Sequence, residues 1–282
     1  MSRVPPFCIG TMQGRLLPRI DGRVQAFPRD GWQSEFALAA EIGYGSLELT
    51  IETASVAIHP LLSAAGRAEL AGLVRESGVV LAGLCCDTVM EHPLVDPDPE
   101  ARIASVALTL QLLEAAGAAG LPMIELPMMG KNSLGQDGAY DVFAQVLDQL
   151  LPVAERTGVD VLLEIDVAPA AIRAFLDRID HPRFGINYDS GNSTWFGFHP
   201  DEELPVYAPW VRNVHVKDCT RKDYSVALGQ GETDFARVFA QLASAGYCGG
   251  FVLQAARRDG DDLAAARDYL AFTRQWVDGT LT

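Results

Sequence analysis

Short apolar segments alternate along the chain with longer segments in which apolar residues recur at helical spacing. The short segments predict strands at residues 7–12, 46–51, 79–86, 123–127, 161–165, 184–188, 211–216 and 251–254. The longer segments predict helices at residues 32–42, 67–76, 99–116, 140–156, 169–178, 203–208, 235–245 and 263–276. Gly43, Gly78 and Gly158 stand where three of these helical patterns stop, which is typical of a helix end. The pattern therefore predicts eight strand–helix units.

Repeated strand–helix units indicate parallel strands joined by right-handed crossovers. An open doubly wound sheet shares this alternation, but the count of eight and the absence of a glycine-rich phosphate motif after the first strand favour a closed barrel. No change of composition marks a linker within residues 1–282. We therefore expect a single α/β domain, an eight-stranded parallel (β/α)8 TIM barrel.

The composition narrows the range of partners and compartments. The formal charge of −15 argues against nucleic-acid binding, which depends on cations that neutralise phosphates. The five cysteines show no CxxC spacing, so neither a disulfide framework nor a zinc–thiolate cluster is expected. The N-terminus lacks the apolar core of a signal peptide, and no apolar run is long enough to span a membrane. A soluble, cytoplasmic protein without membrane partners is predicted.

Catalytic groups of such barrels lie at the C-terminal ends of the strands. Four consecutive predicted strands end in a potential metal ligand: Glu164, Asp189, His215 and Gln254. A single carboxylate at a strand end is more often a helix cap or an ion-pair partner, but four on adjacent strands favour a shared site. This mixture of oxygen and nitrogen ligands suits one divalent ion, with Mn²⁺ as the first choice and Mg²⁺, Co²⁺ or Zn²⁺ as alternatives.

Other polar side chains should surround this site. Lys217 follows His215 by two residues, so it should face the same side of the strand. There it is a candidate for catalysis or for binding substrate oxygens or a phosphate. An ion pair with a carboxylate at the rim of the barrel is an equal alternative. The candidates for substrate binding are Glu48, Asp87, His92, Glu125, Asn192, Trp195 and Arg221. Asp87, Glu125 and Asp166 are also candidates for a second base, with orientation of a substrate hydroxyl as an equal alternative, and Trp195 is a candidate for stacking on a sugar face.

Four segments carry a family resemblance: NYDSGN at 187–192, VHVKD at 214–218, GQGETDF at 229–235 and AGYCGG at 245–250. Together they resemble the xylose-isomerase-like sugar phosphate isomerase/epimerase family, most of all its L-ribulose-5-phosphate (L-xylulose-5-phosphate) 3-epimerase branch. The resemblance implies a metal held by Glu, Asp, His and a second Glu. Glu164, Asp189 and His215 match these positions, and Gln254 departs from the fourth.

The resemblance implies removal of a proton next to a carbonyl, through an enediolate, in a sugar or sugar phosphate. Glutamine has no proton-accepting form near neutral pH, so Gln254 favours a one-base isomerisation by Glu164 over a two-base epimerisation. The alternatives are a metal-dependent lyase or dehydratase of a keto-polyol of the keto-inositol type, a non-catalytic sugar-binding barrel, and, least favoured, an apurinic endonuclease. A homodimer or homotetramer is expected from the family.

Overall fold

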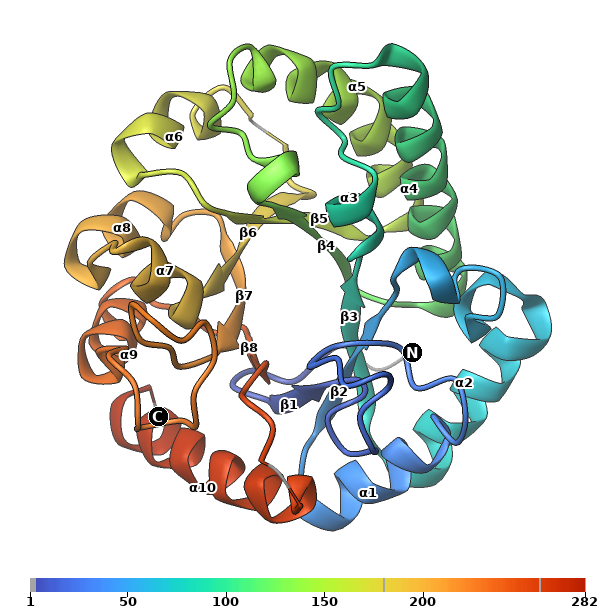
Figure 1. Ribbon diagram of the computed structural model, residues 1–282, viewed down its shortest axis with the longest axis vertical. Helices are drawn as coiled ribbons and strands as arrows, with labels where there is room; N and C mark the ends of the chain where they lie inside the picture. Colours follow the sequence, from blue (N-terminus) through green and yellow to red (C-terminus); the bar gives the residue numbers. More distant parts are fainter. Residues whose placement is uncertain (1–3, 180, 259, 282) are drawn as a thin grey trace.

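The computed structural model describes residues 4–179, 181–258 and 260–281, and its centre is a closed parallel barrel in the order β1 to β8 (Figure 1). The strands are β1 Ile9–Met12, β2 Ser46–Thr50, β3 Val80–Cys85, β4 Met123–Met128, β5 Asp160–Ile165, β6 Phe184–Asp189, β7 Val211–Val216 and β8 Gly250–Leu253. The predicted TIM barrel is confirmed. The first strand begins later than predicted because Phe7 has a left-handed backbone with φ 56°, which is incompatible with a strand.

The helices form a ring outside the barrel (Figure 1). They are α1 Ser34–Ile42, α2 Ala64–Ser77, α3 Thr88–Glu91, α4 Pro99–Ala119, α5 Ala139–Thr157, α6 Pro169–Leu176, α7 Ser190–Phe196, α8 Pro200–Tyr207, α9 Phe235–Ser244 and α10 Asp262–Thr280. Gly43, Gly78 and Gly158 end α1, α2 and α5 in the left-handed conformation, as the sequence predicted.

Helix α7 is the main element that hydrophobic periodicity did not predict. Its first turn, Ser190-Gly191-Asn192-Ser193, consists of residues with poor helix propensity. The turn is stabilised by the Asp189 carboxylate, whose Oδ1 accepts a 2.8 Å hydrogen bond from the Asn192 backbone N–H. The helix therefore begins directly at the C-terminal end of β6, and its first turn is fully buried.

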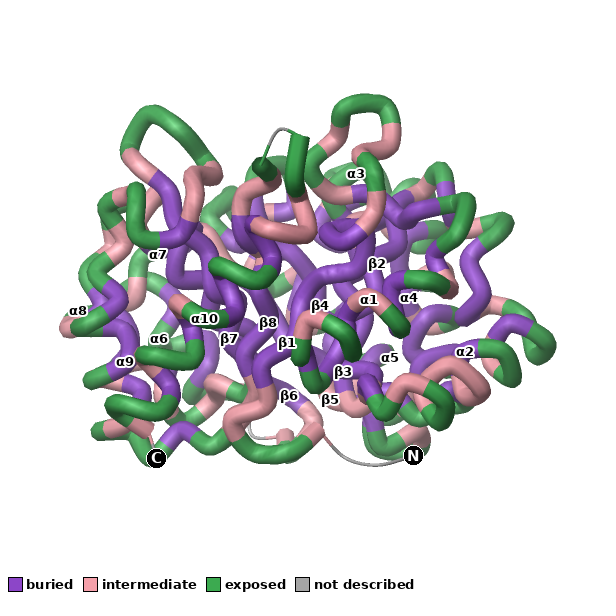
Figure 2. The backbone as a smooth tube through the Cα atoms, turned by 90° about the horizontal axis from the view of Figure 1, so that it is seen from below, coloured by how far each residue is buried: buried purple, intermediate pink, exposed green. Residues whose placement is uncertain are grey.

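The two faces of the strands have different chemistry. Outward residues such as Leu47, Leu163 and Phe251 belong to the main hydrophobic core between barrel and helices, and Figure 2 shows the strands as a buried centre within exposed outer loops. A small inward-facing cluster is apolar and consists of Met12, Ala82, Cys85 and Val252. Toward the C-terminal ends of β2, β4, β5, β6 and β7, inward positions carry polar side chains, and these build the site.

The loop between β1 and α1 is tied down by a buried carboxylate. Glu35 is fully buried, and its Oε1 accepts hydrogen bonds from the backbone N–H groups of Gly14, at 2.7 Å, and Leu16, at 3.3 Å. Burial raises the pKa of Glu35 to about 8. The loop is thus held against the barrel rather than left as a free polar segment.

Two further expectations concern cysteines and membranes. All five cysteines are free thiols, and no disulfide framework was predicted. Across the described ranges, no helix combines the length and the apolar character that crossing a bilayer requires.

Candidate metal centre

Three of the predicted ligands meet at the C-terminal end of the barrel. Glu164 comes from β5, Asp189 from β6 and His215 from β7, and one ligand atom of each lies within 4.8 Å of the others. All three side chains are buried, with His215 completely inaccessible to solvent. His215 Nδ1 and Glu164 Oε2 are 3.2 Å apart. Adjacent parallel strands thus bring together residues that are far apart in the sequence.

Two buried atoms of these three side chains lack hydrogen-bond partners, which suits the binding of a cation. His215 Nδ1 and Asp189 Oδ2 are both buried, and neither has a hydrogen-bond partner among the described residues. Leaving such groups unpaired in a protein interior is costly, and a divalent ion would accept both lone pairs together with one from Glu164. The residues therefore fit a metal with one imidazole and two carboxylate ligands.

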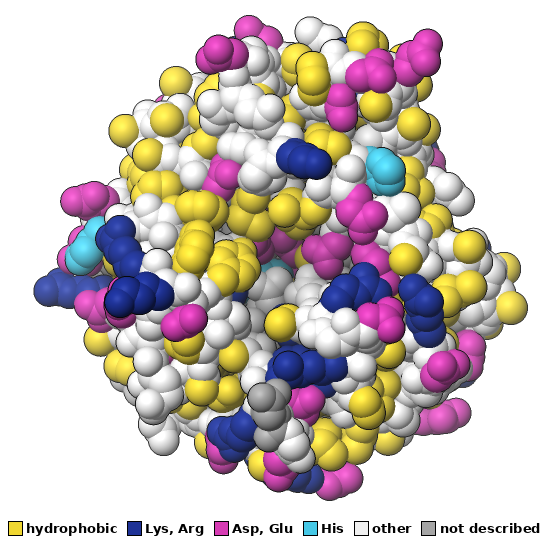
Figure 3. Space-filling model, viewed as in Figure 1, with side chains coloured by type: hydrophobic (Ala, Val, Ile, Leu, Met, Phe, Trp, Pro, Cys, Tyr) yellow, Lys and Arg dark blue, Asp and Glu magenta, His cyan; other side chains and the backbone are white. Residues whose placement is uncertain are grey.

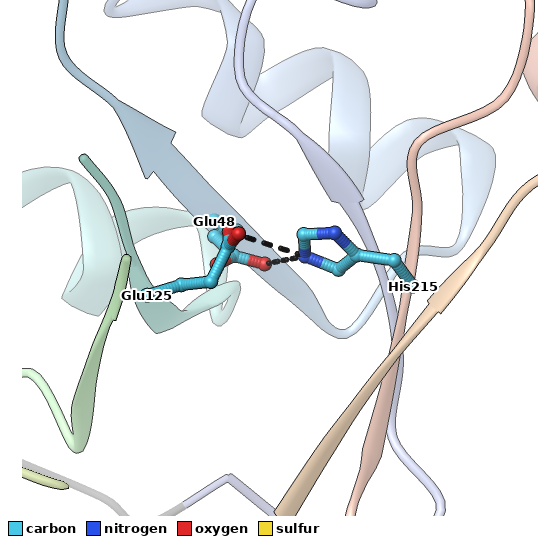
Figure 4. A group of neighbouring side chains, drawn as sticks. All are labelled: Glu48, Glu125 and His215. Carbon is cyan, nitrogen blue, oxygen red and sulfur yellow. Dashed lines mark hydrogen bonds and ion pairs between the residues drawn. The ribbon is translucent and has the colours of Figure 1, made fainter. Parts of the chain in front are cut away.

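Glu48, from β2, holds the other side of the His215 ring (Figure 4). Its Oε2 lies 2.9 Å from His215 Nε2, and both side chains are fully buried. A proton on Nε2 that is donated to Glu48 leaves Nδ1 as the free ligand atom. This is the usual carboxylate–histidine–metal arrangement, in which the carboxylate fixes the tautomer and makes the imidazole a stronger ligand. Glu48, which the sequence predicted as a substrate-binding residue, has a geometry that suits orientation of His215.

Glu125, from β4, is the other carboxyl group on this side of the ring (Figure 4). Its Oε2 is 3.9 Å from His215 Nε2, and within the described part of the chain neither of its oxygens has a hydrogen-bond partner. Burial raises the pKa of Glu125 well above its usual range, and the nearby charge of Glu164 raises it further. Burial and the neighbouring Glu164 charge therefore favour the protonated form of Glu125.

The pKa values of the neighbouring groups are shifted in different directions. Burial opposes the ionisation of Glu164, but hydrogen bonding and the positive charge of His215 lower its pKa below the usual value. Burial raises the pKa of Asp189 to about 6, against the opposing effect of the Lys217 charge. Burial also acts to lower the pKa of His215, but Glu48 and Glu125 raise it well above its usual range. These directions describe the metal-free site, in which a proton on His215 balances the carboxylates.

Two asparagines hold the carboxylate of Glu164. Asn187 Nδ2 donates to Glu164 Oε2 at 2.9 Å, and Asn192 Nδ2 makes a short contact with Oε1. Lys217 Nζ donates to Asn192 Oδ1 at 2.8 Å and lies 3.5 Å from the centre of the Tyr224 ring. Each carboxylate oxygen keeps a second lone pair for a metal or a proton. Lys217 is thus bound within the site, as its position two residues after His215 predicted.

The amide of Gln254, the fourth predicted ligand, faces the β1–α1 loop. Its Nε2 donates to Gln25 Oε1 at 3.2 Å, which leaves its own Oε1 available as a ligand. Gln25 Nε2 donates to Asp87 Oδ2 at 2.8 Å, and Thr50 Oγ1 donates to the same oxygen at 3.1 Å. Burial raises the pKa of Asp87. Gln254 and Asp87 therefore belong to one hydrogen-bonded network at the mouth of the barrel.

The remaining candidates differ in their placement. Trp195 is half-buried, and its ring meets that of Tyr224 edge to face at 5.4 Å, so it belongs to the wall that covers Lys217.

His92 is exposed at the end of α3. Arg221 is exposed as well, and its guanidinium packs beside Gly197 at the end of α7. Neither side chain joins the buried hydrogen-bonded groups around His215. Figure 3 shows this face hollowed at the centre, with acidic side chains gathered in and beside the hollow.

Asp218 supports the loop that follows β7. Its Oδ2 accepts hydrogen bonds from the backbone N–H groups of Gly229, at 2.8 Å, and Gly231, at 2.9 Å, and its Oδ1 accepts one from Thr233 at 3.2 Å. A Cβ atom on Gly231 would collide with this carboxylate and with the backbone oxygen of Cys219. The HVKD and GQG segments of the sequence are therefore two halves of one structural unit.

Sequence reasoning missed several residues of the site. Asn187 was recognised only as part of a motif, and Asn213, Gln25 and Tyr224 were not singled out. Asn213 lies two residues before His215, so strand alternation was a usable signal for placing it in the barrel interior. Gln25 and Tyr224 come from loops, whose path is not encoded in a periodic pattern.

Comparison with known proteins gives the family. A family model described as "Xylose isomerase-like TIM barrel" matches residues 36–276. L-ribulose-5-phosphate 3-epimerase UlaE of Salmonella heidelberg (strain SL476) is 24% identical over 265 residues, which cover 87% of this chain and 88% of that protein. The same enzyme of Shigella flexneri serotype 5b (strain 8401) is 24% identical over 244 residues, with 83% and 85% covered.

Solved structures share the fold. The apo form of 3-keto-D-glucoside 4-epimerase YcjR from E. coli has a TM-score of 0.75 at 22% identity, with 95% of this chain and 99% of that chain covered. D-psicose 3-epimerase with D-tagatose from Clostridium cellulolyticum H10 has a TM-score of 0.76 at 18% identity, with 98% and 99% covered. The curated relatives are epimerases, which confirms the expectation of an isomerase-type enzyme. Because the family match spans most of the chain and the observed barrel agrees with it, this chain belongs to the xylose isomerase-like TIM barrel family.

Proposed function

We propose that this protein is a divalent-metal-dependent sugar isomerase or epimerase that removes a proton next to a carbonyl group and proceeds through an enediolate. The observation that carries the proposal is the convergence of three ligand atoms: His215 Nδ1 lies 3.2 Å from Glu164 Oε2, and beside them Asp189 Oδ2 is buried without a hydrogen-bond partner in the described structure. Glu164, Asp189 and His215 would hold the ion, with Gln254 Oε1 as a fourth ligand. Mn²⁺ is the proposed metal because the ligand set mixes hard oxygens with one imidazole.

The protein side chains provide the proton chemistry. The metal, when bound, supplies Lewis-acid polarisation of the substrate carbonyl. Glu164 is ionised in a buried site and acts as the base that takes the proton. Asn187 and Asn192 hold its two oxygens, so the carboxylate is already oriented before the substrate arrives. Lys217 reaches the same space and stabilises negative charge that develops on substrate oxygen.

A second protonatable group is needed if the configuration at a carbon is inverted, because the proton must then return on the other face. The family carries a glutamate for this where the present chain has Gln254. Glu125 is the candidate replacement, because it is a buried carboxyl group near His215 whose pKa is raised by burial and by the charge of Glu164. With Glu164 alone, transfer of a proton between adjacent carbons on one face remains available. The site thus supports aldose–ketose isomerisation directly and epimerisation only with the help of Glu125.

The proposed substrate is a sugar or a sugar phosphate. The UlaE relatives are named for L-ribulose 5-phosphate, whereas the structural relatives are named for sugars such as D-psicose and 3-keto-D-glucosides. Hydroxyl-binding groups are present in the Gln254, Gln25 and Asp87 network at the mouth. A ketose with free hydroxyls next to its carbonyl fits this polar, acidic hollow.

Solvent isotope exchange tests the proposal. Protein stripped of metal and then reloaded with Mn²⁺ is incubated in D₂O with a panel of ketoses, their phosphates and keto-inositols. Incorporation of one deuterium next to the carbonyl, lost in Asp189→Asn and in metal-free protein, is the expected result. Exchange that persists in metal-free protein, or its absence with every sugar when Mn²⁺ is bound, would overturn the proposal. Product analysis in the same experiment separates the isomerase from a dehydratase, which releases water.

A further inference from the structure

A chain of buried amides runs through the barrel wall to Glu164. Asn213 on β7 donates through Nδ2 to Asn187 Oδ1 on β6 at 2.9 Å, and Asn187 donates through Nδ2 to Glu164 Oε2 on β5 at 2.9 Å. The two asparagines are directly paired in the strand register, and both are buried. The chain ends on the oxygen that lies 3.2 Å from His215 Nδ1.

The chemistry of the groups fixes the direction of this chain. An ionised carboxylate only accepts hydrogen bonds, so Asn187 must present its NH₂ group to Glu164 and its carbonyl to Asn213. Asn213 satisfies that carbonyl with its own NH₂ group. We propose that Asn213 is a positioning residue, which acts through the Asn187 amide to hold Glu164 Oε2 in the geometry that metal binding requires. This inference rests on the metal site of the proposed function.

The surroundings of Asn213 make a purely space-filling role a poor account of it. Asn213 lines a cavity of about 680 Å³ at the N-terminal end of the barrel, whose lining combines the inward residues Ala82, Leu162 and Val252 with charged residues such as Asp160, Arg183 and Arg212. An apolar side chain would suit Ala82, Leu162 and Val252, and a buried amide costs free energy unless it is hydrogen-bonded. The partner that compensates that cost is Asn187. The cavity also provides space, so a leucine can replace Asn213 without overpacking the barrel.

The measurement is the dissociation constant of Mn²⁺, obtained by titration calorimetry on the full chain. Asn187→Leu removes the hydrogen bond to Glu164 and is expected to weaken Mn²⁺ binding roughly 10- to 100-fold, the usual effect of losing a group that orients a ligand. Asn213→Leu leaves Asn187 in place but unsupported, and is expected to weaken binding by a smaller factor, roughly 3- to 10-fold. In the Asn187→Leu background, Asn213→Leu is expected to have no further effect, because its influence passes through Asn187.

Control variants distinguish a positioning role of Asn213 from a general effect on the stability of the fold. Ser46→Ala changes another residue of the same cavity and should leave Mn²⁺ affinity unchanged. The Tm of each metal-free variant establishes that it is folded, and Asn213→Ser replaces the leucine variant if that one does not fold. An unchanged affinity in Asn213→Leu, or an equal loss in the presence and absence of Asn187, would contradict the inference while leaving the metal site intact. Failure of the wild-type protein to bind Mn²⁺ would overturn both proposals.

Discussion

Glu48 Oε2 and His215 Nε2 are 2.9 Å apart, and neither side chain is accessible to solvent. The contact crosses the barrel interior from β2 to β7. The other nitrogen of the ring, Nδ1, faces Glu164 and Asp189. Affinity for a metal on Nδ1 should therefore depend on a carboxylate outside the proposed ligand set.

Glu48→Leu removes this hydrogen bond and should weaken Mn²⁺ binding roughly 10- to 100-fold. Glu48→Gln retains an acceptor for Nε2–H but removes the negative charge, so its loss should be smaller. Titration calorimetry of the wild-type protein and both variants gives the order. If Glu48→Leu binds Mn²⁺ as tightly as the wild type, the hydrogen bond at His215 Nε2 has no influence on metal binding at Nδ1.

Bound metal should stabilise the fold. A ligand that binds only the native state at 100 times its Kd raises the free energy of unfolding by about 2.7 kcal/mol. Urea unfolding with and without Mn²⁺ measures this increase, and a chelator should reverse it. Asp189→Asn removes one ligand charge and should largely abolish the increase, whereas Asp177→Asn, on an exposed residue outside the site, should retain it. A metal-independent unfolding curve in the wild type would argue against the site.

The sequence predicted the barrel and the three converging ligands because both follow from repeating physical patterns. Parallel strands separated by helices close in order, so residues at the ends of β5, β6 and β7 had to meet. The hydrogen-bond partners were less accessible to prediction. Glu48 lies one residue after the apolar Leu47 and was interpreted as a sugar contact, because sequence does not reveal which side chains meet across the barrel interior.

Hydrophobic periodicity did not predict the contacts that loop residues make. Gln25 reaches both Asp87 and Gln254 from a segment without a repeating pattern, and helix α7 forms from weak helix formers because Asp189 caps it. These features depend on local hydrogen bonds rather than on an apolar face. Arg221 was proposed from its position near a strand end, but the length of its loop carries it to the exposed end of α7.

Gly231 should be required for the loop that follows β7. A Cβ atom at this position would lie 2.5 Å from the backbone oxygen of Cys219 and would also collide with the Asp218 carboxylate. Gly231→Ala should therefore lower the free energy of unfolding by roughly 1–3 kcal/mol, the usual cost of overpacking. It should also increase cleavage of the loop in limited proteolysis.

Gly72→Ala is the matched control for this change. Its added methyl group meets only the flexible end of Arg75, at 3.9 Å, in the middle of α2. Alanine has the higher helix propensity, so this variant should be as stable as the wild type or slightly more stable. Equal effects of the two substitutions on unfolding would refute the role assigned to Gly231.

Glu35 should make stability depend on pH. Its pKa is about 8 in the folded protein, against an ordinary value of 4.5, so the native state binds a proton that the unfolded state has released. This contribution is fully present below pH 4.5, falls by up to roughly 1.4 kcal/mol per pH unit between these values, and is lost above pH 8. Glu35→Gln keeps the acceptor for Gly14 and Leu16 but cannot ionise.

Urea unfolding of the wild type and of Glu35→Gln across pH 5 to 8 isolates this contribution, because other titrating groups are common to both proteins. The stability of the wild type relative to the variant should decline steadily as the pH rises through this range. Parallel pH profiles would mean that Glu35 titrates at its ordinary pKa in the folded state.

Gln254→Glu should change both metal affinity and reaction type. A carboxylate restores a third negative ligand, so Mn²⁺ binding should tighten by at least about 10-fold, a modest 1.4 kcal/mol. It also supplies a second base, so epimerisation should increase relative to aldose–ketose isomerisation on the same sugar. The variant's new oxygen would face Gln25 Oε1, because the amide nitrogen of Gln25 is engaged by Asp87. In the metal-free protein the new carboxyl would therefore favour its protonated form, which donates to Gln25 Oε1, and Mn²⁺ would have to displace that proton, which reduces the gain.

Gln25 therefore provides the decisive comparison. Combining Gln254→Glu with Gln25→Ala removes the opposing acceptor, and the double variant should bind Mn²⁺ more tightly than Gln254→Glu alone. Gln25→Ala by itself removes the acceptor for the Gln254 amide and the Arg15 guanidinium and the donor to Asp87, so its Mn²⁺ affinity is the baseline against which the double variant is compared. If the wild type epimerises as fast as Gln254→Glu, a base other than residue 254 must already serve the second face, and Glu125→Gln should then abolish epimerisation while sparing isomerisation.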